Sequence, residues 1–264
     1  MRWSYSSMVR LRQLKPRLQG ELKETLSRSC MHVKGHGGAK RCVGIAHHMS
    51  RRYPFIARFD IRHYYESIDH EALLDLLKRN GAGEESIAVV EEYLKLPDMS
   101  ASGKGMIAGG VIYPLLGALY LLPLDTAMKQ REKGGGIIYR RYMDDFFIFA
   151  DTRWKLRKAI KEMYRVLGEL KLTVHTNQKR FIGRTKGGFD FLGYRVSATE
   201  GLQPSTESIR RRNMHIRRLH EQGAGKDRLR QYVIRWRLWL CGGVGELMGE
   251  KRQRPEGDLL GAVD

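Results

Sequence analysis

Three aspartates supply the side chains that metal-dependent phosphoryl chemistry requires. Asp60 lies near the end of a predicted strand at residues 55–61, and Asp144 and Asp145 lie in a predicted turn much later in the chain. Mg²⁺ prefers oxygen ligands such as these carboxylates, and two such ions can activate a hydroxyl and neutralise a leaving phosphate. Only a fold that aligns the strand ends would make the acids one site. The competing interpretation is a solvated turn, because Asp is a common turn residue.

The segments that must position these acids predict an α+β fold. Residues 137–142 and 146–150 are short runs that flank the acidic turn and predict a hairpin. We expect later strands at residues 172–174 and 189–194. Helical spacing of apolar residues predicts helices at residues 71–79, 86–96 and 154–170 and an apolar helix from residue 115 onward.

The chain is strongly basic, with 48 Lys plus Arg against 29 Asp plus Glu and a formal net charge of +19. A field of this sign attracts phosphate backbones, so we expect a nucleic-acid partner. Residues 206–241 predict an arginine-rich helical region that is broken at residues 223–225. Its tryptophans are expected to pack in the core. The arginines expected to contact phosphates without reading bases are Arg210, Arg211, Arg212, Arg217 and Arg218.

Residues 1–52 are basic and weakly periodic, and we expect a loop at residues 32–41. This region contains zinc-ligand residue types at spacings that match no common zinc site, among them Cys30, His32, His36 and Cys42. The chain's three cysteines form no disulfide framework, which favours a cytoplasmic location. Because we find no secretory signal and no apolar stretch long enough to span a bilayer, we expect no membrane partner.

The acidic turn and its flanks, read as Tyr142-Met143-Asp144-Asp145, resemble the YxDD signature of reverse transcriptases. Upstream, residues 59–70 (FDIRHYYESIDH) resemble the family's motif A. In that comparison Asp60 matches a metal-binding acid, and Tyr65 matches the aromatic residue that excludes a nucleotide 2′-hydroxyl. The resemblance thus implies a two-metal site at Asp60, Asp144 and Asp145.

Three further segments follow the family's order. Residues 109–121 (GGVIYPLLGALYL) resemble motif B, which lies against template and incoming nucleotide in the family. Residues 175–183 (HTNQKRFIG) resemble motif D, in which Lys179 matches the proposed general acid toward pyrophosphate. Residues 188–194 (GFDFLGY) resemble the primer grip. Five motifs in one order are far more specific than any one of them.

The likeness is strongest to bacterial reverse transcriptases of the group II intron, retron, diversity-generating and defence-associated kinds. It implies a polymerase right hand with short fingers at residues 1–52, a ferredoxin-like palm at residues 53–195 and a basic helical thumb at residues 196–264. The substrate-binding positions that it implies are Ile61, Tyr65, Gly109, Gly110, Tyr142 and Met143. The primer-grip positions that it implies are Phe191, Leu192, Gly193 and Tyr194.

The implied activity is RNA-directed DNA synthesis with two Mg²⁺ ions, for which Mn²⁺ could substitute. The expected partners are an RNA template, a DNA or RNA primer and deoxynucleoside triphosphates, and a cognate non-coding RNA or accessory protein stays open. Lys40 and Arg41 are candidates for triphosphate contacts. Two departures are notable, because many relatives have Gln where this chain has Ala108 and Ser where it has Tyr113. They leave open an untemplated or protein-primed polymerase, and the short fingers leave open a non-catalytic RNA-binding subunit.

Overall fold

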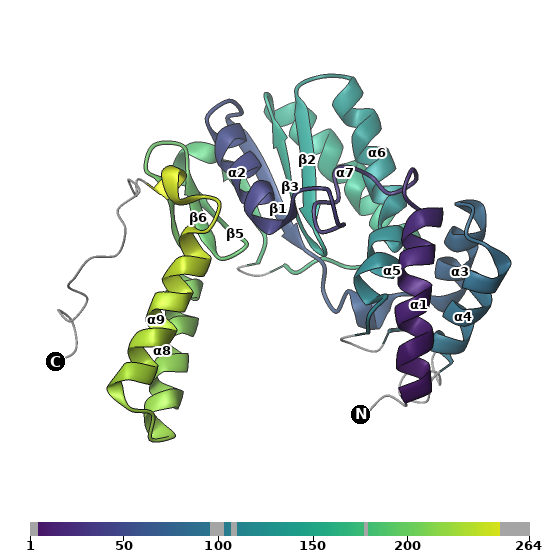
Figure 1. Ribbon diagram of the computed structural model, residues 1–264. Helices are drawn as coiled ribbons and strands as arrows, with labels where there is room; N and C mark the ends of the chain where they lie inside the picture. Colours follow the sequence, from purple (N-terminus) through teal and green to yellow (C-terminus); the bar gives the residue numbers. More distant parts are fainter. Residues whose placement is uncertain (1–4, 96–102, 107–109, 177–178, 249–264) are drawn as a thin grey trace.

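A four-stranded antiparallel sheet forms the centre of the protein (Figure 1). The computed structural model describes residues 5–95, 103–106, 110–176 and 179–248. The strands lie in the order β2-β3-β1-β4, and helices connect β1 to β2 and β3 to β4. This is the βαββαβ arrangement of ferredoxin-like folds. The strands are β1 (Phe55–Asp60), β2 (Ile137–Tyr142), β3 (Asp145–Ala150) and β4 (Phe181–Arg184).

One face of this sheet is covered by helices. Apolar residues such as Phe59, Phe146 and Ile148 point to this side and are buried in the main core. Helices α6 and α7 pack directly on the strands, and the other helices extend the same core. The helices are α1 (Tyr5–Glu21), α3 (His70–Arg79), α4 (Glu84–Leu94), α5 (Tyr113–Tyr120), α6 (Leu122–Lys133) and α7 (Arg153–Glu169).

The opposite face is covered by helix α2 (Gly38–Ser50) and a second, three-stranded sheet. Strand residues alternate between faces, so Ile56, Phe147 and Phe149 point to this second core while their neighbours point to the first. Both faces of β3 are therefore buried, which explains its unbroken apolar run. The second sheet contains β5 (Phe189–Phe191), β6 (Tyr194–Ser197) and β7 (Gly201–Pro204).

Two helices, α8 (Thr206–Glu221) and α9 (Lys226–Cys241), pack against each other and project from the sheets, away from α1, α3 and α4 (Figure 1). Ser205 is the N-cap of α8, because its hydroxyl accepts a hydrogen bond from the Ser208 N–H. Short 3₁₀ turns complete the described chain at Tyr65–Ser67, Thr185–Gly187 and Gly245–Met248. The two-helix prediction for residues 206–241 is confirmed.

Several expectations from the sequence were wrong. The loop expected at residues 32–41 ends before Gly38, where α2 begins. Helix α1 was not predicted, because its many basic residues and Pro16 obscure the buried stripe of leucines. Residues 172–174 form only an isolated bridge between Val174 and Ile61, not a strand. Residues 189–194 form a hairpin of two strands, because positive φ angles at Leu192 and Gly193 reverse the chain. Strands β4 and β7 were not predicted.

Among the described residues, no helix combines the length and the apolar character that a bilayer crossing requires.

Candidate active site

Strand register brings the three predicted acids to one end of the central sheet. Asp60 closes β1 directly opposite Asp145, the first residue of β3. Asp145 also pairs with Tyr142 of β2, so Met143 and Asp144 form the turn between these strands. The Ile61 N–H donates a 3.2 Å hydrogen bond to the Asp144 carbonyl and ties the turn to the end of β1. Residues that are far apart in the sequence therefore form one acidic site.

Asp60 lies beside two basic side chains from the segment after α7. The Lys179 Nζ is 3.3 Å and the His175 Nε2 is 3.4 Å from the Asp60 Oδ1. Lys179 is half-exposed, so its ammonium group reaches the acid from the solvent side. Burial raises the pKa of the neighbouring Asp144 carboxyl, and the charge of Asp60 adds to this effect. The site thus concentrates negative charge that a cation would stabilise.

Asp145 differs from the other two acids because Arg58 binds both of its oxygens. The Arg58 Nε donates to Oδ1 at 3.0 Å and its Nη2 donates to Oδ2 at 2.9 Å. Burial raises the pKa of Asp145 to about 6, although the arginine opposes this shift. A bidentate arginine pair of this kind restrains the carboxylate.

The turn that carries Asp144 is held through the backbone of Met143, whose φ is +57°. Its N–H donates to the His32 Nδ1 at 3.0 Å, and its carbonyl accepts from the Arg141 Nη1 at 3.2 Å. Arg141 is fully buried in a two-bond ion pair with Asp125, at 2.7 and 2.8 Å. Neither His32 nor Asp125 was assigned a role at this site from the sequence, because no local pattern marks either one.

Two of the remaining predicted substrate positions, Tyr142 and Ile61, lie beside this turn. Tyr142 packs its ring edge-on against His32, at 5.9 Å between centroids. The side chain of Ile61 is buried in the main core, so its backbone is the part nearest the acids. Gly110 lies against Tyr93, and a Cβ at this position would be 3.1 Å from the tyrosine oxygen. Ala108 and Gly109 lie outside the described residues.

Tyr65 lies in the short turn after β1, and its ring is stacked on that of Tyr113 from motif B. The ring centroids are 3.5 Å apart, and the planes differ by 19°. The two segments that resemble motifs A and B therefore meet through these tyrosines.

The predicted primer grip is the β5–β6 hairpin. Phe191 and Tyr194 form its last pair, and Leu192 and Gly193 form a two-residue turn with positive φ at both positions. Phe191 packs edge-on against Phe147 at 5.1 Å between centroids. Because Phe147 and Asp145 are two residues apart on β3, the hairpin lies on the sheet face that Asp145 shares.

The predicted phosphate-binding arginines all lie on α8, in the projecting helical pair (Figure 1). Arg210 and Arg211 form ion pairs with Glu207, and Arg212 lies 4.8 Å from the Trp236 ring centroid. Arg217 and Arg218 are exposed. The expectation of core tryptophans was wrong for Trp239, which is 53% exposed.

Lys40 lies at the junction between α2, β6 and the end of α9. Its ammonium group donates to the Trp239 carbonyl, to the Tyr194 hydroxyl and, at 3.1 Å, to the Leu240 carbonyl. It also lies over the Trp239 ring, 4.4 Å from the centroid. Lys40 therefore fixes the projecting helices, in contrast to the triphosphate contact considered from the sequence.

Two of the histidines near the N-terminus, His32 and His36, bind backbone carbonyl oxygens. His32 Nε2 is 2.9 Å from the Pro114 carbonyl, and His36 Nδ1 is 2.9 Å from the Cys30 carbonyl. Within the described parts of the chain, no group of three or more Asp, Glu, His and Cys side chains has the arrangement of a metal site.

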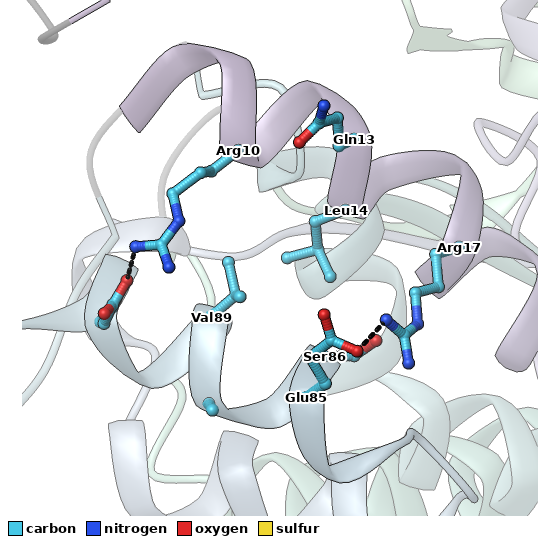
Figure 2. A pocket seen from close by; sticks show the side chains of 9 residues that line it. Arg10, Gln13, Leu14, Arg17, Glu85, Ser86 and Val89 are labelled. Carbon is cyan, nitrogen blue, oxygen red and sulfur yellow. Dashed lines mark hydrogen bonds and ion pairs between the residues drawn. The ribbon is translucent and has the colours of Figure 1, made fainter. Parts of the chain in front are cut away.

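A separate groove lies between α1 and α4 (Figure 2). The Arg10–Glu92 ion pair, at 2.8 Å, and the Arg17–Glu85 ion pair join its two sides. None of the predicted site residues lines this groove, so it belongs to the helix packing and not to the acidic site.

Comparison with known proteins identifies the family. The family described as "Reverse transcriptase (RNA-dependent DNA polymerase)" matches residues 8–196. Protein YkfC of Escherichia coli (strain K12) is 23% identical over 173 residues, which cover 52% of this chain and 45% of that protein.

Solved structures with the same fold include telomerases. Apo telomerase from Candida tropicalis has a TM-score of 0.57 at 14% identity. The match covers 76% of this chain and 42% of the telomerase chain. Telomerase from Candida albicans, in complex with a fragment of telomeric RNA, has a TM-score of 0.55 at 13% identity. That match covers 74% of this chain and 37% of the telomerase chain. The chain thus spans less than half of each of these relatives. The expected α+β right-hand polymerase fold is confirmed, and the chain belongs to the reverse transcriptase family.

Proposed function

We propose that this protein is an RNA-directed DNA polymerase that extends a 3′-hydroxyl on an RNA template. The observation that carries the proposal is the meeting of Asp60 and the Asp144 turn at one end of the central sheet, with Lys179 beside Asp60. Family membership supports a nucleotidyltransferase of the reverse-transcriptase type. Phosphoryl transfer depends mostly on positioning and charge neutralisation, which such a site would supply.

The acids fit the proposed Mg²⁺ ions by their chemistry. All three offer only carboxylate oxygens, and Mg²⁺ in nucleotide enzymes commonly uses one or two carboxylates together with substrate phosphates. A preformed cage of three or more protein ligands is therefore not required. Asp60 and Asp144 would be the main ligands, and Asp145 would contribute less because Arg58 binds both its oxygens. Bound Mg²⁺, or Mn²⁺ in its place, would polarise the attacking hydroxyl and the phosphate oxygens.

Other side chains have proposed roles around this centre. Lys179 would donate a proton to the leaving pyrophosphate, which its half-exposed position beside Asp60 supports. Tyr65 would exclude a 2′-hydroxyl and so select deoxyribose. The β5–β6 hairpin would position the primer end on the face that it shares with Asp145. The basic α8 would contact the nucleic-acid backbone.

The proposed partners are an RNA template, a DNA or RNA primer and deoxynucleoside triphosphates. The RNA complex named for the Candida albicans telomerase supports RNA binding by this fold. A cytoplasmic location, a cognate RNA and an accessory protein belong to the proposal as expectations.

Primer extension on a heteropolymeric RNA template tests the function. The reaction contains a DNA primer, four deoxynucleotides and Mg²⁺, and a parallel reaction contains chelator. We expect a product that follows the template sequence and requires the metal. A product that ignores the template would instead favour untemplated synthesis, and tight RNA binding without synthesis would favour a non-catalytic subunit.

A further inference from the structure

The ring of Tyr65 is enclosed by aromatic neighbours. Tyr113 stacks on one face, and Tyr64 lies on another side at 4.7 Å between centroids and a 56° angle. Tyr64 is itself anchored, because its hydroxyl donates a 2.5 Å hydrogen bond to the Gly117 carbonyl. The orientation of Tyr65 therefore depends on its neighbour Tyr64 and on helix α5, which carries Tyr113 and Gly117.

Glycine at position 117 allows this close packing. A Cβ at Gly117 would lie 2.8 Å from the Tyr65 Cε1 and 3.3 Å from the Tyr64 Cε1. Such a contact would force one ring to move, so the helix that carries Tyr113 is fitted closely to Tyr65. Within the described residues, the Tyr65 hydroxyl is buried and has no hydrogen-bond partner. Ring packing, and not a polar contact, therefore holds this side chain.

The stacked pair also lies beside the acidic site. Burial raises the pKa of Tyr113 to about 12, and the negative charge of Asp144 contributes to that shift. Burial also raises the pKa of Tyr65, and Tyr113 and Asp144 add to the effect. Tyr65 and Tyr113 are both only partly buried, so the stacked pair reaches the surface of the protein.

We propose that Tyr113 is a positioning residue for the sugar gate, which fixes the Tyr65 ring and so determines how strongly the enzyme rejects ribonucleotides. This inference rests on the proposed function. A steric gate distinguishes two sugars by one hydroxyl group, so it fails when the gate ring can move by about the size of that group. Stacking between aromatic rings opposes such a movement.

The test measures kcat/KM for single incorporation of dATP and of ATP opposite a template uracil, with Mg²⁺. Tyr113→Ser removes the stacked ring, Tyr113→Leu keeps bulk without stacking, and Tyr113→Phe keeps the ring. We expect the ratio of dATP to ATP efficiency to fall about tenfold in the serine and leucine variants. The phenylalanine variant should keep the original ratio.

A double variant separates a gate effect from a direct contact with the nucleotide. Tyr65→Ala should lose most discrimination, and adding Tyr113→Ser should reduce it no further, because Tyr113 acts through Tyr65. Far-ultraviolet circular dichroism checks that each variant is folded.

Two results would overturn the inference, and they have different meanings. An unchanged dATP-to-ATP ratio in both Tyr113→Ser and Tyr113→Leu would remove Tyr113 from the gate and leave the proposed function intact. Absence of dATP incorporation by the unaltered protein would contradict the proposed function itself, and this inference with it.

Discussion

The His32 Nδ1 accepts a hydrogen bond from the backbone N–H of Met143 at 3.0 Å, across more than a hundred residues of sequence. Nδ1 is thus the acceptor, and Nε2 carries the proton toward the Pro114 carbonyl at 2.9 Å. Burial, together with the nearby charge of Arg141, lowers the pKa of His32 to about 4, so the ring is neutral near pH 7. One imidazole therefore links the acidic turn to the start of α5.

Removing this imidazole should slow synthesis more than it weakens substrate binding. His32→Ala leaves the Met143 N–H without its partner, and an unsatisfied buried group costs about 1–3 kcal/mol. We expect kcat for nucleotide addition to fall about tenfold or more, with KM changed by less than about threefold. Steady-state kinetics with one deoxynucleotide provide both values.

Two replacements serve as controls for His32. His32→Asn can keep an acceptor near the position of Nδ1, whereas His32→Gln places its amide near the position of Nε2. Asparagine should therefore restore more of kcat than glutamine does. Equal activity of all three variants would contradict a positioning role for this histidine.

The buried pair of Arg141 and Asp125 supports the same turn and a large part of the core. Both side chains are fully buried, and Asp125 also accepts a 3.0 Å hydrogen bond from the Tyr139 hydroxyl. Asp125→Leu should destabilise the protein by about 3–5 kcal/mol, because it leaves a buried arginine without its counter-charge. Urea unfolding followed by circular dichroism measures this loss.

The double variant Asp125→Leu/Arg141→Met should recover most of that stability, because neither charge then remains in the core. It should still synthesise slowly, since Arg141 also donates to the Met143 carbonyl. A stable double variant with full activity would show that the turn does not need this bond.

Lys40 should affect how long the enzyme stays on its template. Its bonds to the end of α9 hold the projecting helices against α2, so Lys40→Met should loosen that junction. We expect shorter products per binding event in primer extension with a heparin trap, and little change in deoxynucleotide KM. Arg51→Met is the matched control, because it removes the same charge from an exposed residue at the end of the same helix. A higher KM with unchanged product length would instead support a triphosphate contact by Lys40.

The sequence predicted the acidic residues of the site better than it predicted the side chains that hold them in place. Asp60 and the Asp144-Asp145 pair stand beside strands with strong apolar patterns, so their positions at strand ends could be predicted from the residues alone. The resemblance to a family supplied the fold that aligns them. The central hairpin and helices α3 and α7 were predicted within a few residues because their periodicity is regular.

The contacts that hold the site depend on tertiary packing. His32 lies in a glycine-containing loop with no periodic pattern, and its partner Met143 is remote in sequence. In the sequence, Arg141 has the pattern of an exposed polar strand residue, but in the structure it is buried in an ion pair with Asp125. Helix α1 was missed because only a narrow leucine stripe marks its buried side. Such features follow from long-range contacts, which no local pattern encodes.

The most direct test compares three isosteric variants, Asp60→Asn, Asp144→Asn and Asp145→Asn, in single-turnover incorporation of one deoxynucleotide on an RNA template with Mg²⁺. RNA affinity is measured on the same preparations. We predict that the first two variants lose roughly a thousandfold or more in rate. Asp145→Asn should lose less, because Arg58 already binds that carboxylate, and all three should bind RNA as tightly as the unaltered protein does. Full activity of either Asp60→Asn or Asp144→Asn would contradict the account.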